Sequence, residues 1–317
     1  MAGASVAAEI LLAIVLMQLK HKDIEKLFKV TSGRRIRLKD LDPAWAPREL
    51  QEDELKARAR DYLKENLEAL TTAQGVLWAN DRHSVLVVLQ AMDGAGKDGV
   101  IRHVMGGVNP QGCQVFSFKK PSDEELDHNF LWRFMRALPE RGRIGIFNRS
   151  YYEDVLVVRV HPELLERQKL PAESLGKSIW KQRFDDINAF ERHLVRNGTL
   201  VLKFFLHMSK KEQRRRFIAR LDDPDKQWKF SNADIDEREH WDAYQTAFED
   251  AINQTGTKWA PWWVIPADRK YVTRALISTV ITHSIEELGL KMPVVPPARQ
   301  QELVEARRRL DGEKSKK

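Results

Sequence analysis

The amino-acid sequence predicts an α/β protein of three layers, in which a five-stranded, mostly parallel sheet has helices on both faces. Two observations lead to this fold class. Short apolar runs rich in Val, Ile and Phe recur between Ser84 and Pro266, and such runs are typical of strands buried on both faces. Longer segments with helical periodicity separate the runs, and this alternation indicates parallel strands joined through helices.

Residues 1–37 are expected to form a leader and a short helix. The apolar run Ile10–Leu19 is too short to span a membrane and no Lys or Arg precedes it, so we expect neither a membrane anchor nor a secretory signal. Alternatively, residues 1–16 are an added leader before a chain that starts at Met17. From Asp42 to Trp78, apolar residues recur at three- and four-residue steps, which predicts a helical extension packed on the core.

Five strands and five helices are then expected to alternate along the main domain, residues 38–290. The strands are Ser84–Ala91, Gln114–Phe118, Ile144–Phe147, Thr199–Leu206 and Trp262–Pro266. The helices are Asp98–Met105, Asp123–Leu138, Ser174–Asn197, Lys210–Leu221 and Asp234–Gln254. Such sheets bind ligands beyond the carboxyl ends of their strands, so the site is expected in the loops that start at Met92, Asn148 and His207.

Composition and charge narrow the class of partner. The 317 residues carry 53 Lys or Arg against 46 Asp or Glu, a net charge of +7 that suits a polyanionic ligand. Part of the excess lies in a basic C-terminal tail, residues 291–317. The single cysteine, Cys113, excludes a disulfide framework and a multi-cysteine metal site, and it fits a cytoplasmic protein. The histidines show no metal-ligand spacing.

A glycine-rich turn follows the first predicted strand, in the segment Ala91–Gly99. The segment departs from the pattern GxxxxGK[ST], because Ala91 replaces the first glycine and Asp98 replaces the Ser or Thr. Its glycines still allow backbone N–H groups to face an anion, a helix N-terminus follows, and Lys97 adds a positive charge. The alternative is a tight turn without a ligand. We predict a phosphate-binding loop formed by Gly94, Ala95, Gly96, Lys97, Asp98 and Gly99.

The two aspartates of this loop are candidates for a magnesium site. Mg²⁺ prefers one or two carboxylates together with water and phosphate oxygens, and the loop lacks the usual hydroxyl ligand. Asp93, inside the turn, is the preferred ligand. Asp98 is either a second ligand or the N-cap of the following helix, and the sequence does not decide between them.

A second cluster of polar residues follows the third predicted strand. Asn148 stands where an acidic residue is usual, and Glu153 lies one turn further along. Arg149 is predicted to bind phosphate, because its guanidinium can hold two phosphate oxygens at once. The alternative is a surface ion pair between Arg149 and Glu153, four residues apart.

The segment 210–236, after the fourth strand, is predicted to form a basic helix and a lid. Turn residues and then aromatic residues follow the helix, which suits a flap over the site. An ordinary solvated helix face is the alternative. The cations predicted to contact the ligand are Arg216, Arg220, Lys226 and Lys229.

Several of these segments together resemble the polyphosphate kinase 2 family. The matching motifs are Gln90–Gly99, Gly107–Gly112, Phe147–Glu153, and Leu221–Pro224 with Trp228–Phe230. The similarity extends from about Leu38 to Leu290. Asn148 together with Glu153 resembles the class III branch, which phosphorylates nucleoside mono- and diphosphates, whereas the other classes usually have Asp at the position of Asn148.

The resemblance implies a P-loop kinase fold with a helical lid, and magnesium, with manganese as a possible substitute. It implies that Asp93 coordinates the metal and orients the acceptor, and that Lys97 and Arg149 bind the transferring phosphoryl group. Glu153 would assist the metal or the acceptor, next to Asn148 on the nucleotide side. The lid cations would line a tunnel for polyphosphate. Family members assemble as dimers or tetramers, so a homodimer or homotetramer is expected.

The sequence therefore predicts a Mg²⁺-dependent enzyme that transfers a terminal phosphoryl group from polyphosphate to AMP or ADP, and to guanine nucleotides as well. An ATP-dependent nucleoside monophosphate kinase on the same fold is the first alternative. A non-catalytic nucleic-acid-binding protein is the second, but its basic residues would be interleaved with aromatic residues along strands. Here they cluster on a helix, so no nucleic acid is expected as a partner, and no membrane.

Overall fold

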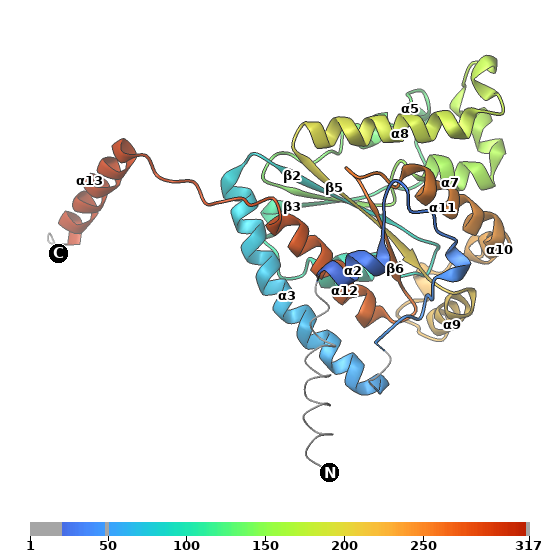
Figure 1. Cartoon of the computed structure of the whole chain (residues 1–317), viewed down its shortest axis with the longest axis horizontal. Helices are drawn as coiled ribbons and strands as arrows, with labels where there is room; N and C mark the ends of the chain where they lie inside the picture. The colour runs from blue at the N-terminus through green and yellow to red at the C-terminus, as the bar shows by residue number, and fades with distance from the viewer. Residues whose placement is uncertain (1–20, 48–50, 315–317) are drawn as a thin grey trace, which may run out of the picture.

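The computed structural model describes residues 21–47 and 51–314, and its centre is one sheet in the order β1-β6-β5-β2-β4-β3 (Figure 1). Within the described residues the strands are β1 (Lys29–Val30), β2 (Ser84–Gln90), β3 (Cys113–Ser117), β4 (Ile144–Asn148), β5 (Thr199–His207) and β6 (Trp262–Pro266). All neighbouring pairs are parallel except β1 with β6. The mostly parallel α/β sheet is thus confirmed, but the predicted number of strands is too low by one. β1, with two residues, is too short to show a periodicity.

Helices cover both faces of this sheet. The α-helices of the described residues are α2 (His21–Phe28), α3 (Glu52–Asn80), α4 (Lys97–Val104), α5 (Asp123–Leu126), α6 (Trp132–Met135), α7 (Glu153–Val160), α8 (Ile179–Arg196), α9 (Lys210–Leu221), α10 (Ala233–Glu239), α11 (Trp241–Thr255), α12 (Lys270–Glu286) and α13 (Pro297–Lys314). Figure 1 shows α3 and α12 together on one side of the sheet, with α7, α8 and α11 on the other. The sheet is therefore the middle of three layers.

The central strand shows why this layering follows from sequence. Every residue of β2 is buried, and its side chains alternate between two apolar cores. Val85, Val87 and Leu89 pack with the α3, α4 and α12 layer, whereas Leu86 and Val88 pack with the α7, α8 and α11 layer. A strand that is apolar on both faces can only be stable with helices on both sides.

The predicted helices differ from the observed ones in several places. The predicted helix Asp234–Gln254 is divided at His240 into α10 and α11, and the helix predicted from Ser174 begins at Ile179. The predicted helix Asp123–Leu138 is broken into α5 and α6, because the side chain of Asn129 accepts a hydrogen bond from the Leu131 N–H (3.1 Å) and competes with helical pairing. No element was predicted for α12, which is buried almost all round and rich in β-branched residues. Such a segment has no polar stripe, so helical periodicity cannot reveal it.

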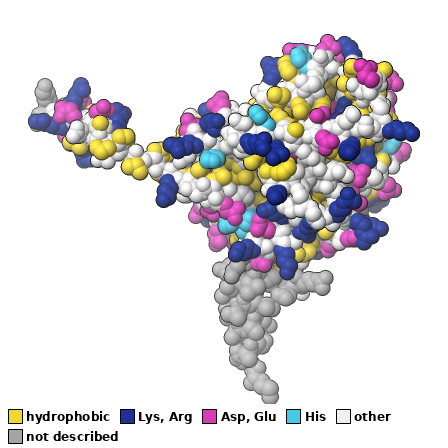
Figure 2. All heavy atoms as spheres, turned by 45° about the horizontal axis from the view of Figure 1, so that its top comes forward, with side chains coloured by type: hydrophobic (Ala, Val, Ile, Leu, Met, Phe, Trp, Pro, Cys, Tyr) yellow, Lys and Arg dark blue, Asp and Glu magenta, His cyan; other side chains and the backbone are white. Residues whose placement is uncertain are grey.

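The C-terminal helix α13 stands apart from the other helices in Figure 1, at the end of an extended segment. Figure 2 shows charged side chains of both signs over the visible face, and hydrophobic side chains exposed on α13. Among the residues that the structure describes, no helix is both long and apolar enough to cross a bilayer.

Candidate active site

A hollow of about 870 Å³ lies where the carboxyl ends of β2, β3 and β4 meet the start of α4. Parallel α/β sheets bind ligands at this edge. Among the residues whose side chains are described, three aspartates line it against ten cationic side chains, which are Lys97, Lys119, Lys120, Arg149, Arg215, Arg216, Arg220, Lys226, Lys270 and Arg274. The lining therefore has a formal excess of seven positive charges, which selects for a ligand with several negative charges.

The glycine-rich turn forms a loop that wraps around the start of α4. Gly94 and Gly96 have φ angles of 82° and 103°, a conformation that glycine adopts without strain. A Cβ atom at Gly94 would also lie 2.9 Å from the Phe217 side chain on α9. Gln213, also on α9, donates a hydrogen bond to the Asp93 carbonyl (2.8 Å). The loop is thus shaped by its glycines and held by α9.

Lys97 is the first residue of α4, and its side chain is almost completely buried under the loop. Its Nζ donates to the Ala91 carbonyl (3.0 Å) and lies 3.8 Å from Asp93 Oδ1. Burial lowers the pKa of Lys97, and the Asp93 carboxylate opposes this change. A phosphate at the loop would add to the negative charge that Asp93 already places beside this ammonium group.

Arg149 has a backbone conformation that is unusual for any residue except glycine, with φ of 65°. Such a conformation costs roughly 1–3 kcal/mol and is concentrated at functional sites. The Arg149 N–H bonds to the Leu89 carbonyl on β2 (3.1 Å), and this bond holds the strained turn against the central strand. The guanidinium reaches Asp93 Oδ1 (2.8 Å) and lies 3.7 Å from Glu153, so the predicted cluster Asp93, Lys97, Arg149 and Glu153 is assembled at one place.

The two carboxylates of this cluster have different surroundings. Burial would raise the pKa of Asp93, but the charges of Lys97 and Arg149 outweigh it and lower the pKa. Burial raises the pKa of Glu153, and Arg149 and Lys97 offset this only in part. Asp93 lines the hollow, whereas Glu153 lies behind Arg149. Asp93 is therefore an ionised carboxylate that a ligand can reach.

Asn148, at the end of β4, is hydrogen-bonded to the glycine-rich loop, which we interpret as the phosphate-binding loop. Its amide donates to Asp98 Oδ1 (2.8 Å), and Ser117 Oγ on β3 is 3.4 Å away. The structure assigns the N-cap of α4 to Gly96 and puts Asp98 inside the first turn, so the N-cap interpretation of Asp98 is wrong. The Asp98 side chain instead joins the first turn of α4 to the end of β4.

Three of the predicted lid cations have side chains that the structure describes, and these lie in different environments. Arg216 is buried, and its guanidinium donates to backbone carbonyls of Gly94 and Ala95. Arg220 is partly exposed at the hollow and pairs with Asp234 (3.2 Å) at the start of α10. Lys226 is exposed there and pairs with Asp223. The side chain of Lys229 lies outside the described residues.

Five cations that line the hollow were not predicted as site residues: Arg215, which lies on α9, and four that follow β3 and β6. Lys119 and Lys120 follow β3, and Lys270 and Arg274 lie in the first turns of α12, after β6. All four lie just beyond carboxyl ends of strands. The rule that directed the search to the loops after Met92, Asn148 and His207 applies equally to these two loops, so the signal was present in the sequence.

A buried polar network lies beneath the strained turn. Lys203 on β5 and Glu191 on α8 are completely buried and form an ion pair (2.6 Å). The hydroxyls of Tyr151 and Tyr152 both donate to the same Glu191 carboxylate oxygen (2.8 and 2.9 Å). Because these tyrosines stand between Arg149 and Glu153, the network fixes the backbone that carries both groups.

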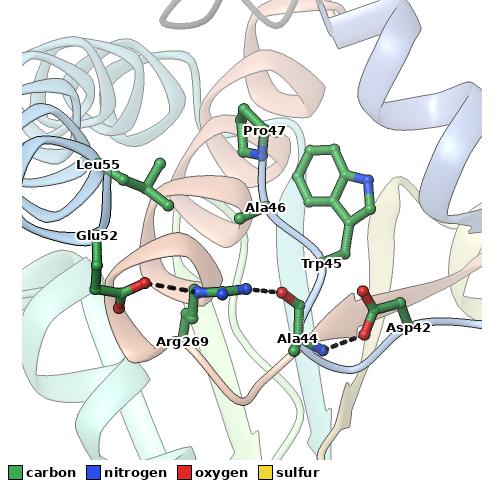
Figure 3. Close-up of a pocket in the computed structure, with 8 residues that line it drawn as sticks. All are labelled: Asp42, Ala44, Trp45, Ala46, Pro47, Glu52, Leu55 and Arg269. Carbon is green, nitrogen blue, oxygen red and sulfur yellow. Dashed lines mark hydrogen bonds and ion pairs between the residues drawn. The ribbon is translucent and has the colours of Figure 1, made fainter. Parts of the chain in front are cut away.

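A second, smaller hollow of about 350 Å³ lies at the loop before α3 (Figure 3). Arg269 crosses it, donating to Glu52 (3.1 Å) and to the Ala44 carbonyl. Arg269 is the one cation among the described residues of this lining and is thus engaged, and Asp42 and Glu52 add negative charge. This hollow does not suit an anionic ligand, so the larger one is the candidate site.

The glycine-rich loop lies between a central parallel strand and a helix, with a lysine beneath it and an arginine opposite. These features place the protein in the class of P-loop phosphotransferases. Comparison with known sequences narrows this class. The chain belongs to the polyphosphate kinase 2 family, whose sequence model, described as "Polyphosphate kinase 2 (PPK2)", matches residues 51–292.

Similar proteins agree with this assignment. An ADP-polyphosphate phosphotransferase of Rhodopseudomonas palustris is 50% identical over 290 residues, which cover 90% of this chain and 98% of the relative. An AMP/ADP-polyphosphate phosphotransferase of Meiothermus ruber is 42% identical over 280 residues, covering 88% of this chain and all of the relative. The crystal structure of polyphosphate kinase 2 from Arthrobacter aurescens superposes with a TM-score of 0.79 at 36% identity, covering 89% of this chain and 96% of that one.

Proposed function

We propose that this protein is a polyphosphate:nucleotide phosphotransferase, which transfers the terminal phosphoryl group of inorganic polyphosphate to nucleoside mono- and diphosphates. The observation that carries the proposal is the lining of the large hollow, with ten cations against three aspartates around a phosphate loop. Polyphosphate has about one negative charge per phosphate unit, so a site that needs this many cations suits a chain of phosphates. The names of the relatives support the same reaction.

The proposed reaction breaks the P–O bond to the terminal phosphoryl group and forms a new one to an acceptor phosphate oxygen, leaving polyphosphate one unit shorter. Such a transfer needs in-line positioning and neutralisation of charge rather than a protein nucleophile. The N–H groups of the loop and Lys97 would hold the transferring group from one side. Arg149 would neutralise it from the other, after exchanging its present contact with Asp93 for phosphate oxygens.

The chemistry of Asp93 suits a divalent cation at this place. Its carboxylate is ionised, faces the hollow and stands next to the phosphate loop. Mg²⁺ takes one or two carboxylates plus phosphate oxygens and waters, and Mn²⁺ accepts similar ligands. When bound, the ion would neutralise charge on the phosphates. Asp93 is our proposed ligand, and Glu153, which lies behind Arg149, is proposed to hold Arg149 or to complete the metal site.

Nucleoside monophosphates and diphosphates are both proposed as acceptors. The proposal rests on Asn148 with Glu153, as in class III members, and on the relative that is named for AMP and ADP. Asn148 bonds to Asp98 at the junction of the two strand tips, next to the phosphate loop. Guanine nucleotides are proposed as further acceptors.

The test is a comparison of donors with the purified protein. AMP or ADP is incubated with Mg²⁺ and either long-chain polyphosphate or a nucleoside triphosphate, and the products are separated by chromatography. Formation of ATP from ADP with polyphosphate alone supports the proposal. Transfer that requires a triphosphate donor would support a nucleoside monophosphate kinase instead, and salt-dependent binding of nucleic acid without turnover would support a binding protein.

A further inference from the structure

A cluster of potential metal ligands lies at the end of α12 that is remote from the phosphate loop. Lys270, at the start of α12, lines the large hollow, and His283 is thirteen residues further along. At 1.5 Å per residue this is about 20 Å along the helix axis. At the far end, α12 packs against α2, whose first residue is His21.

Two histidines and a glutamate meet there. One ligand atom from each of His21, His283 and Glu287 lies within 4.8 Å of the other two. The two imidazole rings have centroids 4.0 Å apart at an angle of 43°. Small side-chain rotations bring such atoms to the 3–4 Å separation of ligands around one ion with bonds of about 2.0–2.2 Å.

His21 supplies an independent reason to expect a ligand. Its side chain is 8% exposed, yet Nε2 has no hydrogen-bond partner. Buried polar atoms nearly always have a partner, so an unpaired imidazole nitrogen at this depth needs an explanation. A metal ion would accept its lone pair.

The two helices present the same arrangement of ligand types. His21 with Glu25 on α2, and His283 with Glu287 at the end of α12, are both four residues apart and therefore share a helix face. Both His283 nitrogens face carboxylates, with Nδ1 3.6 Å from Glu286 and Nε2 3.5 Å from Glu287. The negative end of the α12 dipole favours a cation at the same place.

We propose that His21, His283 and Glu287 form a binding site for a zinc-like divalent transition-metal ion that fastens α2 to α12. Imidazole with carboxylate is a donor set that Zn²⁺ accepts in tetrahedral geometry, with water as the fourth ligand, because the nearby Glu25 carboxylate is paired with Lys29. The site would stabilise the attachment of the N-terminal helix, and it takes no part in phosphoryl transfer. Sequence spacing could not reveal it, because its two halves are more than 250 residues apart.

The test measures Zn²⁺ binding and thermal unfolding of the full-length protein. Protein stripped with a chelator is titrated with Zn²⁺ in millimolar Mg²⁺, which is added to compete with Zn²⁺ at the proposed metal site of Asp93. At about a hundredfold excess of free Zn²⁺ over its dissociation constant, the midpoint of unfolding should rise by about 5 °C. His283→Ala should lose this rise and one equivalent of bound Zn²⁺, and Glu287→Gln should weaken binding.

Both substituted side chains are at least partly exposed, so the variants should fold. His193→Ala, an exposed histidine on α8, is the matched control and should behave like the wild type. Visible absorption of bound Co²⁺ should report nitrogen ligands in the wild type and change in His283→Ala. The proposal is overturned if Zn²⁺ leaves the unfolding midpoint of the wild type unchanged, or if His283→Ala binds as much Zn²⁺ with the same rise.

Discussion

Replacement of Arg216 by Ala should lower the stability of the whole protein. Its effect should not be limited to weaker binding of polyphosphate. The guanidinium is buried between α9 and the phosphate loop, where it donates to the carbonyls of Gly94 (3.1 Å) and Ala95 (2.7 Å). It also donates to the carbonyls of Ala267 and Asp268 before α12, at 2.5 and 3.2 Å. Arg216 therefore joins three segments of the site through their backbones.

The size of the effect follows from these contacts. Hydrogen bonds to a charged group contribute roughly 1.5–3 kcal/mol each, and removal of one partner from a buried ion pair costs about 3–5 kcal/mol. Arg216 also pairs with Glu212 (2.7 Å), which keeps Arg215 as a second partner. Because such contributions are not additive, we expect the free energy of unfolding to fall by about 3–5 kcal/mol.

Urea unfolding of Arg216→Ala measures this loss, and Arg214→Ala, an exposed neighbour on α9, is the control that should change stability by less than about 0.5 kcal/mol. Since the loop carbonyls lose their partner, kcat should fall with long and short polyphosphate alike. The opposite result would be a stability within about 1 kcal/mol of the wild type together with a raised KM for long polyphosphate only. That result would show that Arg216 mainly binds the polyphosphate donor. It would refute the structural role in which Arg216 holds the phosphate loop against α9.

Three further predictions concern residues around the site. Arg220→Ala should raise KM for polyphosphate about tenfold or more and leave KM for nucleotide unchanged, because Arg220 is exposed at the hollow; equal KM values in variant and wild type would contradict this. Lys203→Met should lower the free energy of unfolding by about 3–5 kcal/mol, because it leaves the buried Glu191 carboxylate unpaired, and the double variant Lys203→Met with Glu191→Leu should recover part of this stability. A Lys203→Met protein as stable as the wild type would contradict the pairing. Burial raises the pKa of Asp154 to about 6, so the folded state binds the proton more tightly and stability should fall as pH rises from about 4 to 6. Asp154→Asn should remove this loss of stability, which amounts to about 3 kcal/mol at 1.36 kcal/mol per pKa unit. Unfolding curves with the same pH dependence in the variant as in the wild type would contradict the prediction.

The sequence predicted the sheet and the phosphate loop because both depend on local patterns. A strand such as β2 is apolar throughout, and glycines that need positive φ mark the loop after it. The helix α12 was missed for the opposite reason: most of its residues are buried, and its few exposed polar residues lie near its two ends, so no continuous polar face reveals its period.

The roles of the lid cations could not be predicted in the same way. Arg216 and Arg220 are four residues apart and both line the hollow, yet the guanidinium of Arg216 is buried against the phosphate loop whereas that of Arg220 is partly exposed. This difference depends on how closely α9 approaches Gly94, which is a tertiary property. The strain at Arg149 is likewise invisible in sequence, because the hydrogen bond that holds it joins Arg149 to Leu89, sixty residues earlier in the chain.

The most direct test of the account is the rate of ATP formation from ADP and polyphosphate by Lys97→Ala, with no nucleoside triphosphate added. Lys97 lies under the loop, and its charge is proposed to act on the phosphoryl group during transfer. Loss of one preorganised electrostatic donor costs about 10²–10³ in kcat, so a folded variant should be at least about a hundredfold slower than the wild type. Near-normal turnover by a folded Lys97→Ala protein would contradict the assignment of the glycine-rich loop as the site of transfer.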